Sequence, residues 1–190
     1  MDTANMEARV RAVESVLHDH GLDTATGLPA LDHLATEEWV PRNGARVVAK
    51  AWTDPAFKAR LMDNGIAAIR ELGIGMPKHH RHLVVLENTD TVHNVICCTL
   101  CSCTAMSLIG IPPDWYKDLE YRSRIVREAR TVLREMGLDL PESIELRVWD
   151  TTADTRYMVL PQRPAHTTGW SEEQLVEAVT RDSLIGVSRL

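Results

Sequence analysis

Apolar side chains recur at helical spacing through the first twenty residues of the chain, with charged side chains between them. The apolar positions are Met6, Val10, Val13, Val16 and Leu17. A spacing of three to four residues places them on one face of a helix. Gly21 follows directly and favours a helix end, because glycine readily adopts the left-handed conformation that closes helices. The pattern predicts an amphipathic helix that ends near residue 20.

Further helical segments are predicted before residue 78. They are a short helix at 31–38, after a turn at 21–29, and a longer helix at 54–72. Asp54 followed by Pro55 has the form of a helix start, since Asp caps free N–H groups and Pro suits the first helical position. Glycines and a proline after residue 72 end this pattern. Residues 1–77 are therefore predicted to form an N-terminal helical arm.

The pattern changes at residue 83 from helical spacing to short runs rich in β-branched residues. The predicted elements are strands at 83–86, 94–97, 143–149 and 156–160, and helices at 115–136 and 171–182. Ser171 and Gln174 have the spacing of a capping box, which places a helix start there. This mixture of strands and helices predicts an α+β domain over residues 78–190.

The charge balance excludes several classes of partner. The chain carries 21 Lys and Arg against 27 Asp and Glu, which gives a formal charge of −6. An acidic protein does not attract phosphate backbones, so non-specific binding to nucleic acid is not expected. No apolar run approaches the ~20 residues that cross a bilayer, and no signal-peptide pattern opens the sequence. We expect a cytoplasmic protein that binds neither nucleic acid nor membrane.

All four cysteines lie within seven positions, 97–103. A disulfide framework spreads its cysteines along the chain, so this cluster has another purpose. Cys98, Cys101 and Cys103 bring their thiols together only if the segment forms a tight loop, for which a metal ion is the natural centre. The spacing alone leaves three interpretations open. They are structural zinc with a histidine as fourth ligand, another metal, and a metal-free group of redox-active or buried thiols.

The sequence around the cysteines is more specific than their spacing. The informative blocks are VICCTLCSCT at 95–104, LIGIPPDWYK at 108–117, EYRSRIVRE at 120–128, DTTADTRYMVLPQRP at 150–164, GWS at 169–171 and LIGV at 184–187. Over roughly 83–187 the chain thereby resembles the α subunit of nitrile hydratase. The resemblance implies a helical arm followed by a layered α/β/β/α domain that carries a cysteine-claw metal loop.

The resemblance implies a single non-corrin Co(III) ion as cofactor, with Fe(III) as the alternative. The implied ligands are the sulfurs of Cys98, Cys101 and Cys103 and the deprotonated backbone amides of Ser102 and Cys103. Members of the family oxidise two claw cysteines, which implies sulfinic acid at Cys101 and sulfenic acid at Cys103. Thr99 stands where cobalt-type members have threonine and iron-type members have serine, so it favours cobalt.

The implied reaction is the addition of water across the carbon–nitrogen triple bond of a nitrile, which gives an amide. The trivalent ion would act as a Lewis acid on the nitrile nitrogen. Cys101, Ser102 and Cys103 are the expected catalytic group, and both water and the Cys103 sulfenate oxygen fit as the nucleophile. Family members also need a β-type subunit that completes the active site, and commonly an activator protein that delivers cobalt.

The chain departs from the family pattern beside the claw. Members typically have Ala-Trp-Pro where this chain has Ala105, Met106 and Ser107. The change is expected to reshape the pocket, so that among small and heteroaromatic nitriles the bulkier substrates are preferred, as in the toyocamycin nitrile hydratase that acts on a nucleoside nitrile. Cys97 replaces an aliphatic residue and is predicted to be a small buried hydrophobe. Upstream, His-His-Arg at 79–81 replaces a Gln-Gly-Glu stretch.

Other polar residues have both a functional and a structural interpretation. Asp150, Asp154 and Arg156 match family positions near the network that supports the claw, but charged residues beside a strand are more often ordinary surface or structural pairs. The histidine-rich tract at 79–82 is expected to be a solvated loop. A partner or solvent is expected to face three arginines of the 115–136 helix, namely Arg122, Arg124 and Arg127.

Two alternatives to a nitrile hydratase follow from the same residues. The metal-bearing γ subunit of thiocyanate hydrolase shares the claw, and its products, carbonyl sulfide and ammonia, differ from an amide. A non-catalytic zinc-binding interaction module is the alternative from a different class. Stoichiometric zinc together with unmodified cysteines would identify that module.

Overall fold

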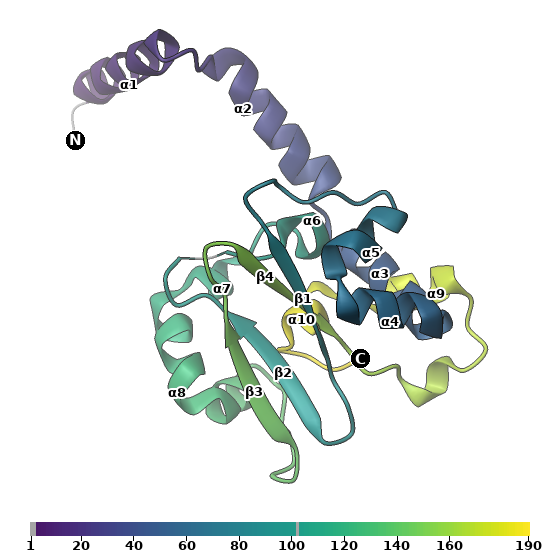
Figure 1. Ribbon diagram of the computed structural model, residues 1–190. Coiled ribbons are helices and arrows are strands. Elements are labelled where there is room, and N and C mark those ends of the chain that lie inside the picture. Colours follow the sequence, from purple (N-terminus) through teal and green to yellow (C-terminus); the bar gives the residue numbers. More distant parts are fainter. Residues whose placement is uncertain (1–2, 102) are drawn as a thin grey trace. The chain divides into compact units, whose positions relative to one another are not determined.

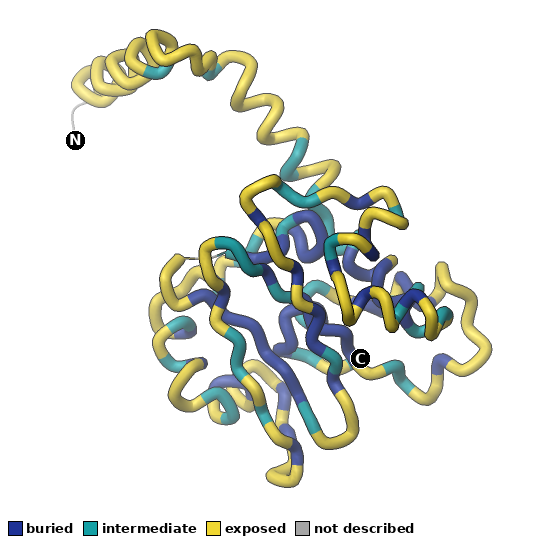
Figure 2. The backbone as a smooth tube through the Cα atoms, viewed as in Figure 1, coloured by how far each residue is buried: buried dark blue, intermediate teal, exposed yellow. Residues whose placement is uncertain are grey.

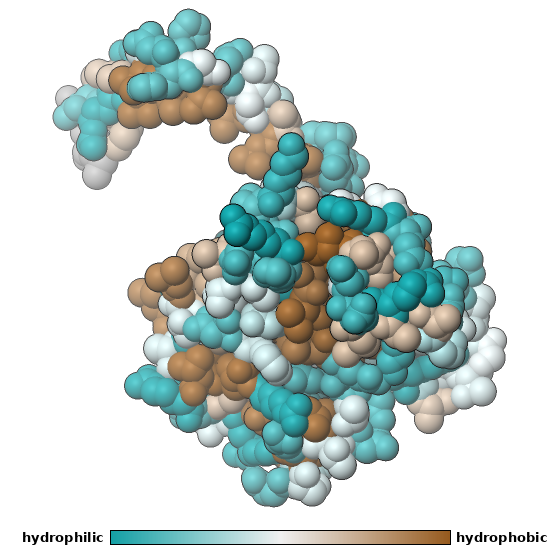
Figure 3. All heavy atoms as spheres, viewed as in Figure 1, coloured by the Kyte–Doolittle hydropathy of each residue, from teal (hydrophilic) through white to brown (hydrophobic). Residues whose placement is uncertain are grey.

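The computed structural model describes residues 3–101 and 103–190. The chain divides into two compact units, with the boundary in the sequence between Glu38 and Trp39. The first unit contains α1 (Thr3–Asp19), α2 (Thr24–His33) and a π-helical turn at Leu34–Glu38 (Figure 1). The predicted helix before Gly21 is confirmed. No residue of α1 or α2 is buried (Figure 2). The apolar side chains of α1 form an exposed stripe along one side of the helix (Figure 3).

The predicted turn at 21–29 is wrong, because α2 begins at Thr24 and contains Pro29. Asp23 caps this helix, and its carboxylate accepts a hydrogen bond from the Ala25 N–H at 3.0 Å. Proline removes the bond that would reach the carbonyl of Ala25. Ala25 is exposed, so water reaches this first turn and lowers the cost of the missing bond.

The second unit begins with three helices, α3 (Pro41–Thr53), α4 (Pro55–Asp63) and α5 (Gly65–Glu71). The expected helix at 54–72 is in fact two helices, because the Asn64 side chain accepts from the Ala67 N–H at 3.1 Å and starts α5. Helix α3 was not predicted, although it has the largest buried face of the three. All three helices lie in the same unit as the strands. The division into a helical arm at 1–77 and an α+β domain at 78–190 stays a prediction.

Four strands form two parallel pairs, and all four were predicted. Strand β1 (His82–Glu87) pairs with β4 (Thr155–Leu160). Strand β2 (Val92–Cys97) pairs with β3 (Glu145–Asp150), with Cys97 opposite Asp150. The turn between β3 and β4 links the pairs, because the Thr151 N–H donates to the Cys97 carbonyl and the Arg81 N–H donates to the Asp154 carbonyl. The ends of β2 and β3 therefore lie beside the starts of β1 and β4 (Figure 1).

Helices fill the connections between the strands. The segment after β2 contains α6 (Met106–Ile109), α7 (Asp114–Lys117) and α8 (Leu119–Glu135), and the segment after β4 contains a 3-10 turn (Ala165–Thr167), α9 (Glu172–Ala178) and α10 (Arg181–Ile185). The single helix predicted at 115–136 is interrupted at Asp118, which caps α8. The helix predicted at 171–182 is likewise split before Arg181. Its capping box of Ser171 and Gln174 is confirmed.

The core of the second unit lies between the strand pairs and the helices around them. Helix α8 packs on β2 and β3, α4 and α5 pack on β1, and α10 contacts β2 and β4. Each large apolar side chain that is fully buried here contributes about 1.5–3 kcal/mol. Among these side chains are Phe57, Leu61, Ile69, Ile125, Leu133 and Met158. The predicted α+β mixture is confirmed. Within the described residues, no helix has the length and apolar character needed to cross a membrane.

Candidate metal centre

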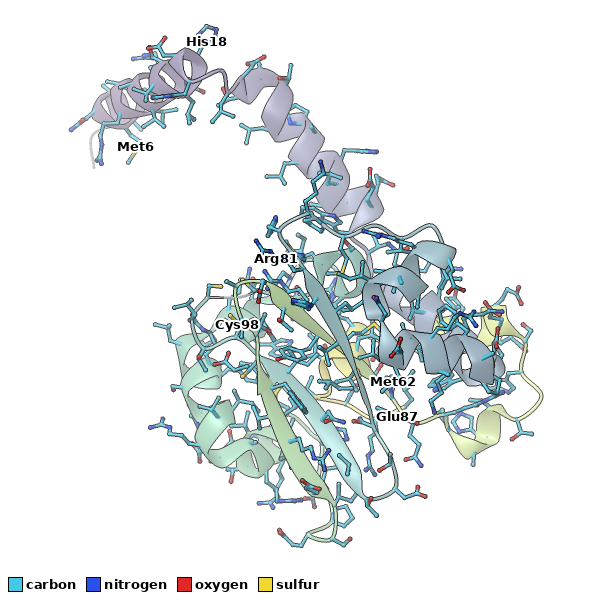
Figure 4. All side chains as sticks on the ribbon, viewed as in Figure 1. Met6, His18, Met62, Arg81, Glu87 and Cys98 are labelled. Carbon is cyan, nitrogen blue, oxygen red and sulfur yellow. The ribbon has the colours of Figure 1, made fainter. Side chains whose placement is uncertain are left out.

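The cysteine segment begins where β2 ends. Cys97 is the last residue of this strand, and its carbonyl accepts bonds from both the N–H and the hydroxyl of Thr151 at 3.0 Å. Cys98 follows at the same edge (Figure 4) and is 1% exposed. After it the chain leaves the sheet, so that Leu100 is 87% exposed at the tip of the loop. The segment is therefore anchored at its first residues and projects beyond them.

Three thiols converge in this loop. The sulfurs of Cys98, Cys101 and Cys103 all lie within 4.8 Å of one another, and this is the one group of potential metal ligands found in the described part of the chain. The distance from Cys98 Sγ to Cys101 Sγ is 3.5 Å, and that from Cys101 Sγ to Cys103 Sγ is 2.8 Å. The Cys101 N–H also donates to Cys98 Sγ at 3.3 Å. Ser102, whose amide is the other predicted ligand, lies outside the described residues.

The donor set of the loop consists of three sulfurs. Tetrahedral zinc with bonds of about 2.3 Å separates its sulfur ligands by about 3.8 Å, whereas ligands at right angles are about 3.3 Å apart. The Cys98–Cys101 sulfur distance of 3.5 Å lies between these two values, and the Cys101–Cys103 distance of 2.8 Å lies below both. Within the described residues no histidine joins the three thiols as a fourth ligand. The described residues therefore offer three sulfurs without the fourth Cys or His ligand that structural zinc takes.

Cys97 does not belong to this group. It is fully buried in the hydrophobic core, as the sequence predicted. Burial, with the nearby Asp150 carboxylate, raises the pKa of its thiol to about 12. Cys103 is half-buried, and burial together with the hydrogen bond to Cys101 raises the pKa of its thiol to about 11. A cation that binds the claw must displace the proton of Cys103, so that metal binding releases protons.

Tyr116 supports the end of the claw. Its hydroxyl donates to the Cys103 carbonyl at 3.2 Å, and its ring is fully buried against Trp115 and Tyr121. Burial raises the pKa of this phenol well above its usual value, so it stays a neutral donor. Tyr116 therefore packs against its aromatic neighbours and positions the end of the loop.

The structure corrects the expectations for two polar groups. The tract at 79–82 is not simply a solvated loop, because His80 is 4% exposed and its Nδ1 has no hydrogen-bond partner among the described residues. Burial, with a further effect of Arg156, lowers the pKa of His80 to about 4, so the ring is neutral. Arg156 is also buried, and its Nη1 donates to the Thr152 carbonyl at 2.6 Å. Its charge also acts on Cys103.

Arg122 is partly exposed, and its guanidinium binds the claw loop. Its Nε donates to the Cys98 carbonyl at 2.9 Å and its Nη2 to the Thr99 carbonyl at 2.6 Å. Asp150 binds the same loop, since its carboxylate accepts from the Thr99 N–H at 2.9 Å and from the Thr99 hydroxyl. By contrast, the side chain of Asp154 bonds to Thr152 and Thr155 and, within the described residues, to no group of the claw. Sequence reasoning missed Arg122, because helical spacing does not show which arginine reaches a loop.

Comparison with known proteins decides the family. Residues 4–188 match the family described as nitrile hydratase, alpha chain. The chain belongs to this family. It is 54% identical to a nitrile hydratase subunit alpha of Rhodococcus sp over 181 residues, which cover 95% of this chain and 90% of that protein. It is 49% identical to the cobalt-containing nitrile hydratase subunit alpha of Pseudonocardia thermophila, and this match covers 95% of the chain and 88% of that protein.

A solved structure extends the likeness to the whole chain. The Fe-type nitrile hydratase of Comamonas testosteroni Ni1, in a variant with two adjacent histidines changed to alanine, superimposes with a TM-score of 0.93 at 60% identity and covers 100% of this chain and 92% of its own. The chain of the printed sequence likewise has one pair of adjacent histidines, His79 and His80. The thiocyanate hydrolase subunit gamma of Thiobacillus thioparus is 39% identical, and this match covers 98% of the chain and 81% of that protein. The nitrile hydratases are thus more similar than the alternative enzyme.

Proposed function

We propose that this chain is the metal-bearing subunit of a nitrile hydratase that works with cobalt and two oxidised cysteines. The observation that carries the proposal is the convergence of the three claw sulfurs within 4.8 Å of one another. Membership of the nitrile hydratase α-chain family supports the same reaction, the hydration of a nitrile to an amide. Cys98, Cys101 and Cys103 would bind the ion through sulfur, and Ser102 and Cys103 through their backbone amides.

Cobalt is supported by Thr99 and by the cobalt-containing relatives. Iron is the alternative, because a solved relative at 60% identity is an Fe-type enzyme. Either trivalent ion would supply the Lewis acidity that makes the nitrile carbon electrophilic. We propose Co(III) as the native ion, and metal analysis of the purified protein distinguishes it from Fe(III).

The exposure of the thiols supports the proposed pattern of oxidation. Cys101 is exposed and Cys103 is half-buried, whereas Cys98 is 1% exposed. Oxidants reach accessible thiolates first, so sulfinic acid at Cys101 and sulfenic acid at Cys103 fit this order. Cys98 is then left as an unmodified thiolate on the protected side of the loop.

Cys103 is the proposed catalytic residue. Its sulfenate oxygen would accept a proton from water while the water oxygen bonds to the nitrile carbon, and the proton is then passed to the nitrogen to give the amide. In the alternative route the sulfenate oxygen itself attacks the carbon, the S–O bond then breaks so that this oxygen leaves with the amide, and a water molecule bonds to the sulfur and restores the sulfenate. A single turnover in ¹⁸O-labelled water separates the routes. Labelled amide supports the base role, and unlabelled amide in the first turnover supports direct attack.

The remaining proposals concern partners and substrate. A β-type subunit would complete the active site and an activator protein would deliver cobalt; a cytoplasmic location stays a prediction.

Met106 is half-buried in α6, and the neighbouring Ser107 is buried with a hydroxyl that has no hydrogen-bond partner among the described residues. These small or flexible residues favour a roomy pocket and larger, heteroaromatic nitriles. Met106→Trp is expected to shift kcat/KM at least several-fold toward small aliphatic nitriles, and a shift toward larger ones would contradict this pocket assignment.

The proposed function is tested on the complex purified from its host. We expect about one cobalt per chain, a mass increase of two oxygens on Cys101 and one oxygen on Cys103, and amide formation from a nitrile panel. Carbonyl sulfide and ammonia from thiocyanate, with no amide from nitriles, would identify a thiocyanate hydrolase instead. Stoichiometric zinc with three unmodified thiols would refute both enzymes.

A further inference from the structure

Two side chains hold the first residues of the claw from opposite sides. Arg122 donates to the consecutive carbonyls of Cys98 and Thr99, at 2.9 and 2.6 Å. Asp150 accepts from the N–H and the hydroxyl of Thr99. Every polar group of Thr99 is thereby bonded. We call Arg122 and Asp150 the claw clamp.

Each half of the clamp is held by the fold. Asp150 ends β3 directly opposite Cys97, the last residue of β2. Arg122 lies in the first turn of α8, next to Tyr121, whose buried hydroxyl donates to the Ile96 carbonyl at 3.4 Å. Asp150 is held by the sheet and Arg122 by helix α8, and both lie outside the loop. The clamp therefore acts as a template for residues 98 and 99.

We propose that Arg122, together with Asp150, is a positioning residue that preorganises the claw for metal capture. This proposal rests on the proposed metal-binding function. Arg122 fixes the direction of the Cys98 and Thr99 carbonyls, and two residues later Cys101 Sγ lies 3.5 Å from Cys98 Sγ. Without the clamp, the binding energy of the metal would have to order the loop as well, which weakens binding.

The chemistry of the clamp requires arginine. A guanidinium donates in parallel from two nitrogens and remains charged, whereas lysine offers a single compact ammonium. Three thiolates around one ion make an anionic centre, so a fixed positive charge on the adjacent backbone also lowers the cost of holding them together. Lysine would keep the charge and lose the two-point geometry, which makes Arg122→Lys the informative variant.

The test measures metal binding, not turnover. Full-length chain is prepared metal-free and anaerobic, Co²⁺ is added, and the sulfur-to-cobalt charge-transfer band reports affinity and ligand geometry. We expect Arg122→Lys to weaken Co²⁺ binding about 10- to 100-fold, the usual effect of losing a group that orients a metal ligand, and to shift the band. Asp150→Asn, which keeps one acceptor, is expected to have a smaller effect in the same direction.

Arg127→Lys is the matched control, because Arg127 lies on the same helix and its Nε donates to Ser123 of that helix. It is expected to leave affinity and spectrum unchanged. If Arg122→Lys does not fold, as judged by circular dichroism, Asp150→Asn decides the question. Affinity within twofold of the unaltered chain, with an unchanged band, in the folded clamp variants overturns the clamp. If the unaltered chain itself binds neither Co²⁺ nor Fe²⁺ through three sulfurs, the proposed function fails instead.

Discussion

The three claw thiols differ in how far water reaches them, although they lie within a few ångströms of one another. Cys98 is buried like Cys97, Cys103 is half-buried and Cys101 is exposed. Reagents that modify thiols must reach the sulfur, so burial controls the order of reaction. At the scale of single residues, the loop thus presents two accessible sulfurs and protects the third.

This difference predicts the order of alkylation in the metal-free chain. Under a limiting amount of iodoacetamide, Cys101 is expected to react first and Cys103 second, with Cys98 and Cys97 unmodified until the chain unfolds. Peptide mass spectrometry measures each site separately. Alkylation in urea is the control, because all four thiols should then react alike. Early modification of Cys98 in the folded chain would show that the loop opens readily.

His93 predicts a pH-dependent loss of stability. Its ring is fully buried, Nε2 donates to the Gly186 carbonyl at 2.8 Å, and Nδ1 accepts from the Asn88 side chain at 3.2 Å. Burial lowers the pKa of this histidine, and the charge of Arg189 acts in the same direction. The unfolded chain binds the proton near pH 6.5, so this contribution to stability is full above that pH and is lost as the pH falls toward the folded-state pKa.

The measurement is the free energy of unfolding between pH 8 and pH 5. His93→Gln is expected to be less stable at pH 8 but to lose less stability on acidification than the unaltered chain. The exposed His166, changed to Gln, serves as the control and should keep the original slope. An identical pH slope in all three proteins would show that His93 is not the group responsible.

At the scale of elements, α10 is joined to β2 by a close backbone approach. Gly186 ends α10 with a φ of +93°, and a Cβ at this position would lie 2.0 Å from the Asn94 carbonyl oxygen. Gly137, after α8, has a similar φ of +95°, but a Cβ there would meet nothing within 4 Å. An alanine at either position would meet the same backbone strain, but only at Gly186 would its Cβ also clash with a neighbouring atom. Comparing the two sites therefore separates backbone strain from steric clash.

Gly137→Ala is therefore expected to cost about 1–2 kcal/mol from the left-handed conformation alone. Gly186→Ala is expected to cost more than about 3 kcal/mol, since α10 must also move away from β2. Chemical denaturation measures both values. Equal costs at the two sites would mean that α10 is free to shift without loss of packing.

The strands could be predicted from sequence, whereas several helix ends could not. Runs such as 83–86 are continuously apolar and contain β-branched valines, so the strand signal is local. Helix α3 was missed although its buried residues, among them Val47 and Val48, follow helical spacing. The breaks at Asn64 and Asp118 were missed because each is a side-chain cap inside an uninterrupted helical pattern. Which strands pair, and in parallel, depends on contacts far apart in the chain.

The candidate site shows the same division. Cysteine spacing and flanking blocks located the claw in the sequence. Its supports were not visible, because Arg122 contacts a carbonyl 24 residues away and Asp150 an N–H 51 residues away. The burial of His80 likewise comes from the tertiary structure and contradicts the polar character of its neighbours.

At the scale of the whole molecule, the apolar face of α1 has no covering element in the first unit. Its side chains at 6, 10, 13 and 16 are between 41 and 58% exposed. A helix with such a face gains stability mainly when the face is buried. This fits a subunit that associates with a second chain through its N-terminal arm.

Charging this face is expected to weaken the heteromer and spare the fold. Val10→Glu with Val13→Glu should lower co-purification of the β-type subunit at least several-fold. The melting temperature of the isolated chain should stay nearly constant, because exposed substitutions change stability by less than about 0.5 kcal/mol. Ala8→Glu with Ser15→Glu adds the same charge on the opposite face as the control. An undiminished complex with the valine variant would place the interface elsewhere.

The parallel pairing of β2 with β3 also sets a time order during synthesis. The claw leaves the ribosome first, while Arg122 follows about two dozen residues later and Asp150 later still. A parallel neighbour requires the whole crossover, here the segment that contains α6 to α8, before it can pair. A nascent chain that stops before residue 150 therefore carries all its sulfur ligands but only the Arg122 half of the proposed clamp. With such a clamp, the tightest metal binding would follow translation of most of the chain, and a delivery factor would act on a nearly finished polypeptide.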